Sequence, residues 1–354
     1  MSMNLRVLLL PFSIVYAGIA RLRNLFFDTG IFSQTSFKFP VILVGNLSVG
    51  GTGKTPHVEY IVEELHKDYR IATLSRGYGR KTSGFVVADM GVTASEIGDE
   101  PMQYFSKFDD ITVAVCENRV EGINKIINLD KKPDVIIMDD GYQHRQANPG
   151  FKILLTAYDK LFTRDYLMPA GDLREPRSSY KRADCIIITR SSEVIAEKEK
   201  NSIAKEISLK SHQQIFFSSL KYDDPVNIFS SQKISLNELK SKQVLLFTGI
   251  ANPSHLEKFL EENSAMLEII SFPDHHDYTG KDIKSIREKF DKFAGENSII
   301  ITTEKDYQRI RNTHLINELN SLPCYFLPIK ISIDRQEAFI NLIRNYVTKN
   351  TGNS

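Results

Sequence analysis

Phe39-Pro-Val-Ile-Leu-Val-Gly-Asn-Leu-Ser-Val-Gly-Gly-Thr-Gly-Lys-Thr55 is an apolar run that continues without a break into a glycine-rich loop. The apolar part predicts a buried strand that ends at Gly45, and residues 56–67 predict the helix that follows. A glycine-rich loop between a strand and a helix binds phosphate, because backbone N–H groups surround the anion and the helix N-terminus adds its positive end. The stretch therefore predicts a nucleotide-binding α/β domain.

The loop residues expected to contact the nucleotide are Ser48, Val49, Gly50, Gly51, Thr52, Gly53, Lys54 and Thr55. Lys54 is expected to reach the β- and γ-phosphates of ATP, and the Thr55 hydroxyl is expected to bind Mg²⁺. The strict P-loop pattern has a glycine where this chain has Ser48, so the loop alone is moderately specific. A glycine-rich turn that binds nothing is the alternative, and the flanking strand and helix disfavour it.

A second signal for a phosphate site is the run Val135-Ile-Ile-Met-Asp139-Asp140, which has the form of a Walker B strand. The carboxyl ends of parallel strands lie beside the phosphate loop, so Asp139 or Asp140 is expected to hold Mg²⁺, directly or through water. Two carboxylates at a strand end are by themselves usually a solvated turn. An upstream phosphate loop makes the metal-binding interpretation the stronger one.

Strands alternate with helices along the chain, which predicts a mostly parallel sheet covered on both faces. In the second half, apolar strands are expected at 184–189, 243–248 and 298–302. The predicted fold class is α/β: a P-loop NTPase-like, mostly parallel sheet with a second, smaller α/β domain. The expected divisions are an N-terminal helix at 1–32, a nucleotide-binding core at 33–157, a linker at 158–183, a second domain at 184–330, and a C-terminal helix and tail at 331–354.

Composition excludes several other classes of protein. The 354 residues exceed the roughly 100–200 of a single domain, and 42% hydrophobic with 25% charged residues argues against disorder. A net charge of +1 gives no bias toward nucleic acid, and nothing in the sequence requires an obligate protein partner. Three widely spaced cysteines with no CxxC pattern argue against structural zinc and a disulfide framework.

The N-terminal segment is unlike an ordinary enzyme. Residues 7–20 are apolar apart from Ser13 and Gly18, and arginines stand at positions 6, 21 and 23. The run is shorter than the about 20 residues of a membrane-spanning helix, and it lacks the small-residue cleavage site of a signal peptide. It fits a helix lying in a membrane interface, and it fits equally a helix packed on the protein's own core.

Seven motifs occur in a characteristic order: GNLSVGGTGKTP (45–56), LSRGYGR (74–80), GDEP (98–101), DDGYQH (139–144), PAGDLREP (169–176), FPDHHDY (272–278) and TTEKD (302–306). Together they resemble the tetraacyldisaccharide 4′-kinase (lipid A 4′-kinase) family, in which a serine at the first P-loop glycine is the norm. The resemblance runs from the N-terminal helix to about Asp306. It implies transfer of the ATP γ-phosphate, with Mg²⁺, to the 4′-hydroxyl of a tetraacylated glucosamine disaccharide 1-phosphate, giving lipid IVA in lipid A biosynthesis.

The resemblance also bears on the N-terminal segment. Family members are peripheral proteins of the cytoplasmic face of the bacterial inner membrane, attached by an N-terminal helix. Residues 1–32 match that helix in position and character. The resemblance therefore favours an interfacial helix, and it makes a membrane surface and the lipid acceptor the expected partners.

For catalysis, the resemblance implies that Asp99 is the base and that His275 from the second domain is its partner, alongside Lys54. A carboxylate–imidazole pair suits proton removal from a sugar hydroxyl, because the imidazole can share the proton as the alkoxide forms. Whether His275 or the adjacent His276 pairs with Asp99 is left open. Without the resemblance, Asp99 would be interpreted as a helix N-cap.

Other polar residues are expected to contact substrate or nucleotide. Arginine forms bidentate contacts with phosphate, which makes arginines near the loop candidates for binding ATP or the 1-phosphate of the acceptor. The expected residues are Glu100, which is also a candidate for orienting the metal, and Arg76, Arg80, Arg119, Arg174 and Glu175.

Three alternative interpretations are less consistent with the sequence. Residues 274–277, Asp-His-His-Asp, are a poor metal cluster, because adjacent histidines in an extended segment point to opposite sides. A P-loop GTPase or ATPase switch that regulates a membrane partner is the main alternative function, but the N/T-K-x-D guanine signature of GTPases is missing. A non-enzymatic membrane-binding module leaves the phosphate loop unexplained.

Overall fold

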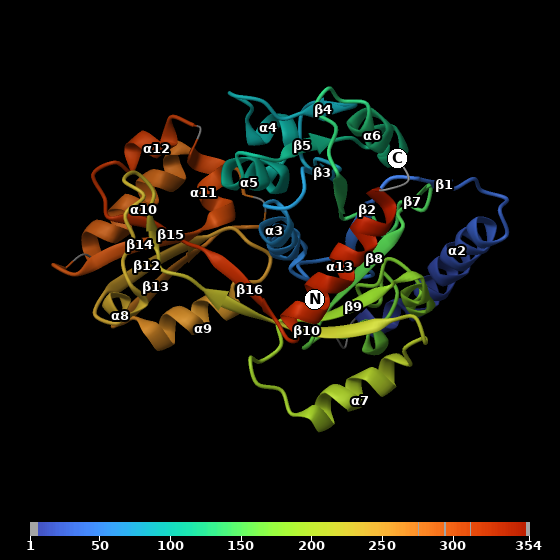
Figure 1. Ribbon diagram of the computed structural model, residues 1–354. Coiled ribbons are helices and arrows are strands. Elements are labelled where there is room, and N and C mark those ends of the chain that lie inside the picture. The colour runs from blue at the N-terminus through green and yellow to red at the C-terminus, as the bar shows by residue number, and fades with distance from the viewer. Residues whose placement is uncertain (1–5, 275, 294, 312, 352–354) are drawn as a thin grey trace.

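The computed structural model describes residues 6–274, 276–293, 295–311 and 313–351. Two α/β domains lie side by side, each built on its own sheet, and a long N-terminal helix lies on the side of the first domain that faces away from the second (Figure 1). The predicted α/β fold with a parallel-rich sheet is confirmed.

The first domain contains a nine-stranded sheet in the order β16-β10-β9-β8-β2-β6-β3-β5-β4. The two edge strands, β16 and β4, pair antiparallel with their neighbours, and all other pairs in the sheet are parallel. The strands are β2 (Val41–Asn46), β3 (Ile71–Ser75), β4 (Val86–Val87), β5 (Thr112–Val115), β6 (Val135–Asp139), β8 (Phe151–Ala157), β9 (Cys185–Thr189), β10 (Gln214–Tyr222) and β16 (Ile329–Ile333). A separate pair joins β1 (Thr35–Ser36) to β7 (Ala147–Asn148).

Helices cover both faces of this sheet because its strands are apolar on both sides. Along β2, Val41 and Leu43 belong to one core cluster, whereas Ile42 and Val44 belong to the other. The first-domain helices are α3 (Lys54–Leu65), α4 (Ala94–Ile97), α5 (Asp99–Lys107), α6 (Arg119–Ile127), α7 (Glu197–Ile207) and α13 (Gln336–Thr351), with short 3-10 turns η2 (Phe162–Arg164) and η3 (Arg177–Arg182). Helices α3, α5 and α13 contribute to one cluster, and α6 and α7 contribute to the other.

The second domain is a smaller five-stranded sheet in the order β11-β15-β14-β12-β13, with only β11 antiparallel. Its strands are β11 (Val226–Asn227), β12 (Gln243–Thr248), β13 (Met266–Ser271), β14 (Ser298–Thr303) and β15 (Cys324–Leu327). Its helices are α8 (Leu236–Leu239), α9 (Ser254–Asn263), α10 (Gly280–Phe293), α11 (Glu304–Arg311) and α12 (Leu315–Glu318). Helices α8 and α9 pack on one face, and α10, α11 and α12 pack on the other.

The two sheets divide at a different place from the predicted domain boundary at residue 184. Strand β9 pairs with β8, and β10 pairs with β9, so the first sheet continues to Tyr222. The chain returns to this sheet at β16, and α13 then packs on the first domain. A buried parallel strand has the same apolar sequence in either sheet, so the sequence does not show which sheet β9 and β10 join. We propose that the second domain is an insertion, residues 223–328, in the first.

The N-terminal helix α2 (Leu10–Asp28) follows a 3-10 turn, η1 (Val7–Leu9), and docks on the first domain through one face. Ser13, Ala20 and Phe27 are buried at a spacing of seven residues, which corresponds to about two helical turns. Polar contacts hold this face: Tyr16 Oη donates to the Arg174 carbonyl at 2.9 Å, and Asn24 Nδ2 donates to Ser179 Oγ at 3.2 Å.

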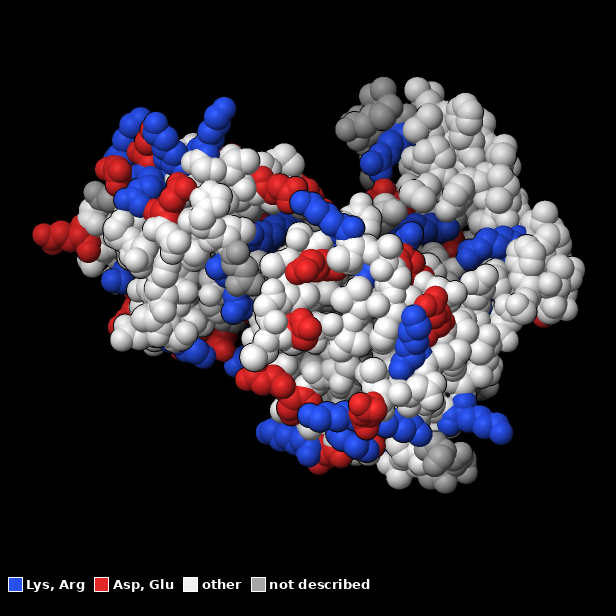
Figure 2. Space-filling model, turned by 90° about the horizontal axis from the view of Figure 1, so that it is seen from above, with Lys and Arg blue, Asp and Glu red and all other residues white. Residues whose placement is uncertain are grey.

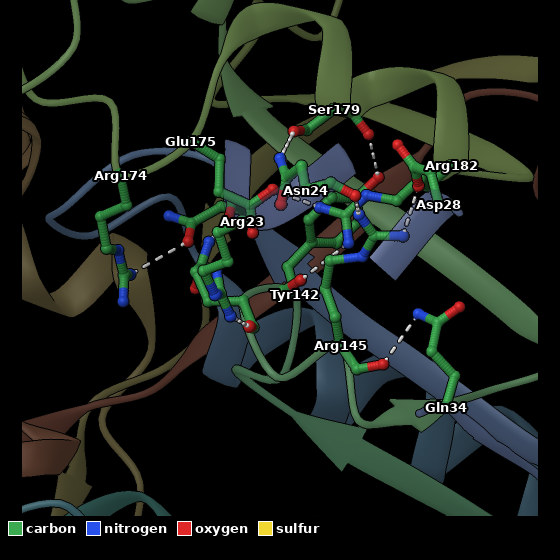
Figure 3. A network of polar contacts seen from close by, with 12 residues as sticks. Arg23, Asn24, Asp28, Gln34, Tyr142, Arg145, Arg174, Glu175, Ser179 and Arg182 are labelled. Atoms are coloured by element: carbon green, nitrogen blue, oxygen red, sulfur yellow. Dashed lines mark hydrogen bonds and ion pairs between the residues drawn. The ribbon is translucent and has the colours of Figure 1, made fainter. Parts of the chain in front are cut away.

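Figure 3 shows the far end of this contact, where Arg145 approaches α2 from the loop after β6. Its guanidinium donates to the Asn24 carbonyl at 3.0 Å, pairs with Asp28 at 2.6 Å, and lies over the Phe27 ring. The side chain of Arg145 is almost fully buried. The sequence presented a core-packed helix and an interfacial helix as alternatives. In the structure, one face of α2 is docked on the first domain and the other face is exposed.

The exposed face of α2 is apolar. Phe12, Ile14, Val15 and Ile19 each have 64–71% of their surface accessible, and Leu22 and Leu25 are about half accessible. The lobe at the upper right of Figure 2, where α2 lies, shows few charged side chains on its outer surface. Across the described part of the chain, no helix combines the length and the apolarity that crossing a bilayer demands.

Candidate functional site

The phosphate loop occupies the predicted position between β2 and α3. Gly50 and Gly53 have φ values of 97° and 84°, a region that side chains disfavour, so the loop needs glycine at both points. Lys54 is the first residue of α3, and Thr55 is buried in its first turn. The loop therefore presents the backbone, the lysine and the hydroxyl in the arrangement that binds polyphosphate.

Two segments far away in the sequence hold the loop in place. The Val49 N–H donates to the Asp172 carbonyl at 2.8 Å, and Arg174 donates to the Ser48 carbonyl at 3.1 Å. From β9, Thr189 Oγ1 donates to the Thr52 carbonyl at 2.9 Å. These contacts fix the conformation of the loop before any ligand binds.

A third support is His57 on α3, which is fully buried. Its Nδ1 lies 2.7 Å from the Gly53 carbonyl, and its Nε2 lies 2.8 Å from Ser218 Oγ on β10. Burial lowers the pKa of His57 to about 4, against a weaker opposing effect of the Gly53 carbonyl. A neutral ring that donates from Nδ1 and accepts from the Ser218 hydroxyl satisfies both contacts. His57 therefore connects the phosphate loop to β10, the strand next to the edge strand β16.

Because the folded protein resists protonation of His57, its stability should depend on pH. Above pH 6.5 the ring is neutral in both states, and this contribution to stability is complete. As the pH falls toward 4, the unfolded chain binds the proton first, which costs up to about 3 kcal/mol. We expect the His57→Gln variant to lose less Tm between about pH 7 and pH 5 than the wild type. The exposed His212→Gln is the control, and equal losses in H57Q and wild type would contradict the prediction.

The predicted Walker B carboxylates lie next to the loop. Asp140 Oδ1 is 3.6 Å from Lys54 Nζ and 3.7 Å from the Arg174 guanidinium. Asp139 ends β6 and is buried, and Tyr104 Oη donates to its Oδ2 at 2.9 Å. Burial, and then the charge of Asp140, raises the pKa of Asp139 to about 6. Two adjacent carboxylates, one of them buried, therefore lie at the end of β6 beside the phosphate loop.

The donor set fits a hard divalent metal ion. In the described part of the chain, Asp139 Oδ1 is buried without a hydrogen-bond partner. Asp140 Oδ1 has no hydrogen bond either, but it lies within ion-pair distance of Lys54 and Arg174. Buried polar atoms are normally paired, so the unpaired oxygen of Asp139 beside a phosphate loop suits a cation. Mg²⁺ prefers carboxylate, hydroxyl and phosphate oxygens, and Asp139, Asp140 and Thr55 supply the first two kinds. These three residues therefore fit the predicted metal.

Asp99 and Glu100 begin α5, directly after Gly98, whose φ of 94° marks the sharp turn from α4. Asp99 Oδ2 accepts from Arg309 Nε at 2.9 Å, and Glu100 Oε1 accepts from Lys305 Nζ at 2.8 Å. Both cations come from α11 of the second domain. The carboxylates singled out by the sequence therefore lie where the two domains meet.

The predicted partner of Asp99, His275, lies outside the described residues, so the pairing stays a prediction. Its neighbour His276 lies 3.1 Å from Asp282 through Nε2 and stacks on Phe272. A Cβ placed on Gly249 would be 3.2 Å from His276 Cβ, and the Gly249 carbonyl accepts from Arg309. The histidine segment is therefore close to the residue that contacts Asp99. Among the described residues, no three His, Cys, Asp or Glu side chains are grouped so that they could hold a metal ion together.

The arginines singled out by the sequence have different environments. Arg119, the first residue of α6, is buried, and burial lowers its pKa to about 10. Burial and the charges of Arg119 and Arg76 lower the pKa of His144 to about 4, so both arginines lie close enough to act on this ring. Arg80 is instead held by Glu117 at 2.5 Å. A role for Arg76, Arg80 or Arg119 in substrate binding stays a prediction.

Glu175 forms a buried ion pair. Its carboxylate accepts from Arg182, whose guanidinium lies over the Tyr142 ring, and the side chain of Glu175 is 1% exposed (Figure 3). Arg174, by contrast, contacts both the phosphate loop and Asp140. The two neighbours therefore differ: Arg174 stays a candidate for contacting nucleotide, and the observed contacts of Glu175 are structural.

Sequence reasoning missed three residues around the carboxylates: Tyr104, Lys305 and Arg309. The TTEKD motif covers the end of β14 and the start of α11, and the sequence assigned no role to it. A motif at the carboxyl end of a parallel strand was a usable signal, because that edge carries the functional residues of such sheets. The contact itself joins residues more than 200 positions apart, which spacing cannot reveal.

The chain is similar to known proteins over almost its whole length. Residues 5–348 match the family described as tetraacyldisaccharide-1-P 4′-kinase, LpxK. The chain is 44% identical to the tetraacyldisaccharide 4′-kinase of Flavobacterium johnsoniae, with 98% of each protein covered. It is 41% identical to that of Bacteroides thetaiotaomicron, with 98% of this chain and 94% of the relative covered.

A solved structure has the same architecture. It is the crystal structure of LpxK from Aquifex aeolicus in complex with ATP, which is 30% identical and superposes with a TM-score of 0.75. The match covers 97% of this chain and 99% of that one, so it includes both sheets and the N-terminal helix.

Proposed function

The chain belongs to the tetraacyldisaccharide-1-P 4′-kinase family, and on that premise we propose that it transfers the γ-phosphate of ATP to the 4′-hydroxyl of a tetraacylated glucosamine disaccharide 1-phosphate. The product would be lipid IVA, an intermediate in lipid A biosynthesis. The observation that carries the proposal is the contact of Lys54 with Asp140, beside the buried unpaired oxygen of Asp139. This arrangement suits a polyphosphate with its metal. A switch that only hydrolyses nucleotide would not require the exposed apolar face of α2.

The proposed chemistry uses positioning and charge more than covalent catalysis. The 4′-hydroxyl oxygen attacks the γ-phosphorus, the bond to the bridging oxygen breaks, and ADP leaves. Lys54 neutralises charge that accumulates on the transferred group, and Asp99 takes the hydroxyl proton. Mg²⁺ held by Thr55, Asp139 and Asp140 would neutralise phosphate charge when it is bound. Arg174 keeps the phosphate loop and Asp140 in register through its contacts to both.

The proposed location of the enzyme is the cytoplasmic face of the bacterial inner membrane, held peripherally by α2. The outer face of α2 exposes several large apolar side chains, which is unusual for a helix that is also firmly docked. The molecule is hollowed between the second domain and this helix, and Lys and Arg side chains lie in the hollow (Figure 2). A lipid acceptor with acyl chains and a phosphate fits a site bordered by an apolar helix and by cations.

The outer face of α2 can be tested separately from its docking role. Phe12 and Ile19 are each 64% exposed, so Phe12→Ser with Ile19→Ser should leave the Tm unchanged. Full burial of each side chain in lipid contributes about 1.5–3 kcal/mol, so binding to liposomes of anionic lipid should fall at least about tenfold. Flotation measures this. Val194→Ser, at an apolar residue that is exposed elsewhere on the first domain, is the control.

If the double variant floats with liposomes as well as the wild type, the outer face of α2 is not the anchor. Deleting residues 1–23 would be a less specific test of the anchor than the double substitution. The deletion also removes the docked residues Ser13 and Tyr16, which contact the loop around Arg174. A loss of Tm in the truncated protein would therefore accompany any loss of membrane binding.

The direct test of the proposed function is phosphorylation of a tetraacyl disaccharide 1-phosphate by the purified protein with ATP and Mg²⁺. We expect product with a new 4′-phosphate and stoichiometric ADP. Hydrolysis of ATP or GTP at the same rate with and without the acceptor, and no phosphorylated lipid, would favour a nucleotide-dependent switch instead.

A further inference from the structure

We propose that Arg309, on α11 of the second domain, is a positioning residue for Asp99. This inference rests on the proposed function, in which Asp99 is the base. Arg309 Nε donates to Asp99 Oδ2 at 2.9 Å, and Nη1 donates to the Gly249 carbonyl at 2.9 Å. The guanidinium is 6% exposed, so this is a buried contact between domains and not a surface ion pair.

The anchor behind Arg309 is rigid. Its Nη1 also donates at 2.9 Å to Asp306, one helical turn earlier, and Asp306 is fully buried. Asp306 Oδ2 accepts from the Gly249 N–H at 3.0 Å and from Thr303 Oγ1 at 2.7 Å. Asp306 is thereby tied to the ends of β12 and β14, and the guanidinium projects from the edge of the second sheet in a fixed orientation.

A second ion pair runs beside the first. Lys305 Nζ donates to Glu100 Oε1 at 2.8 Å, so two successive carboxylates of α5 meet two cations of α11. Adjacent pairs fix both the position of the first turn of α5 and its rotation about the helix axis.

Helix α5 is also fixed to the phosphate site. Tyr104 donates to Asp139, and Lys107 pairs with Glu59 of α3 at 2.7 Å. Helix α5 is therefore held between the second domain and the residues next to the phosphate loop. Arg309 sets where the Asp99 carboxylate lies relative to that loop, and a displacement of about 1 Å in a reacting group costs about 10²-fold in rate.

The type of residue matters at position 309. A guanidinium contacts Asp99, Asp306 and the Gly249 carbonyl at once through its planar fork, and an ammonium group cannot reproduce that geometry. We therefore expect Arg309→Lys to fold normally, because it keeps a cation among the carboxylates. It should still lower kcat by about 10-fold, and Arg309→Met should lower it by about 10²-fold.

The experiment measures kcat, KM for ATP, affinity for a non-hydrolysable ATP analogue, and Tm in Arg309→Lys, Arg309→Met, Asp99→Asn and the double variant D99N/R309M. We expect both Arg309 variants to lose kcat while analogue affinity stays within about twofold, and the double variant to be no slower than Asp99→Asn, because residues that act as one unit are non-additive. Arg287→Met is the control: in the same domain, Arg287 donates to the Glu318 carbonyl and to Ser321 at 2.9 Å.

Different outcomes separate this inference from the proposed function. Full activity in Asp99→Asn removes Asp99 as the base. An inactive Asp99→Asn with unchanged kcat in both Arg309 variants overturns the positioning role alone. A double variant slower than Asp99→Asn by the full factor seen in Arg309→Met also overturns it, because Arg309 would then act independently. If Arg309→Met unfolds, Arg309→Lys decides, since its Tm reports whether the domain interface is intact.

Discussion

Replacement of Lys54 by alanine is expected to reduce kcat by about 10²–10³-fold, the usual effect of removing one preorganised charge from a site of this kind. Lys54 begins α3 at the end of the phosphate loop and points toward Asp140. In the transition state its ammonium group meets the negative charge that develops on the transferred phosphoryl group. The loss should therefore appear in kcat more than in KM for ATP.

The test is steady-state kinetics of acceptor phosphorylation, with Lys67→Ala as the matched control because Lys67 is exposed near the end of the same helix. The loop should keep its conformation in Lys54→Ala, since Val49, Thr52 and Gly53 are held by groups other than the lysine. Retention of more than half of the wild-type activity would show that this loop is not the phosphate site.

The second large effect is expected at Asp99. A positioned general base contributes about 10²–10⁴-fold, so Asp99→Asn should lower kcat by that factor with little change in affinity for ATP. Asparagine matches the size of the carboxylate and can still accept from Arg309, which limits the structural consequences. The exposed Asp110→Asn, between α5 and β5, controls for the loss of a charge.

His275→Ala is expected to slow the reaction as well, and the loss in the double variant D99N/H275A should fall short of the product of the single losses. His275 is outside the described residues, so this expectation comes from the sequence resemblance. Full multiplicativity of the two single effects would argue that Asp99 and His275 work separately.

The parts of the site that lie close together in the sequence could be predicted from it. Gly50, Gly53, Lys54 and Thr55 share one loop, and each has a local reason to be where it is. Asp139 and Asp140 could also be predicted, because they lie at the carboxyl end of an apolar strand of a parallel sheet. In each case a rule about adjacent residues was enough.

The contacts between distant segments could not be predicted. Nothing in the sequence around Asp99 indicates Arg309, because the pair depends on how the second domain packs against α5. The docked face of α2 could not be predicted either, because the groups that contact it, Arg145 and the Arg174 carbonyl, are over 100 residues away in the sequence. The sequence grouped β9 and β10 with the second domain, whereas both strands pair within the first sheet, because an apolar run shows that a strand is buried and not which strand lies beside it.

The antiparallel return of β16 beside β10 has a consequence for how the chain folds. The Asp223 N–H donates to the Pro328 carbonyl at 3.0 Å, so the residues between them leave the first sheet and re-enter it at one point. The edge of that sheet closes only after residues 223–328 have been made, and closing so long an unstructured loop is entropically unfavourable. If the second domain folds first, it brings its two ends together and replaces the long loop by a short effective one. Strand β16 and helix α13 would then be the last elements to pack on the first domain. The first domain would therefore complete its folding only after the second domain had folded.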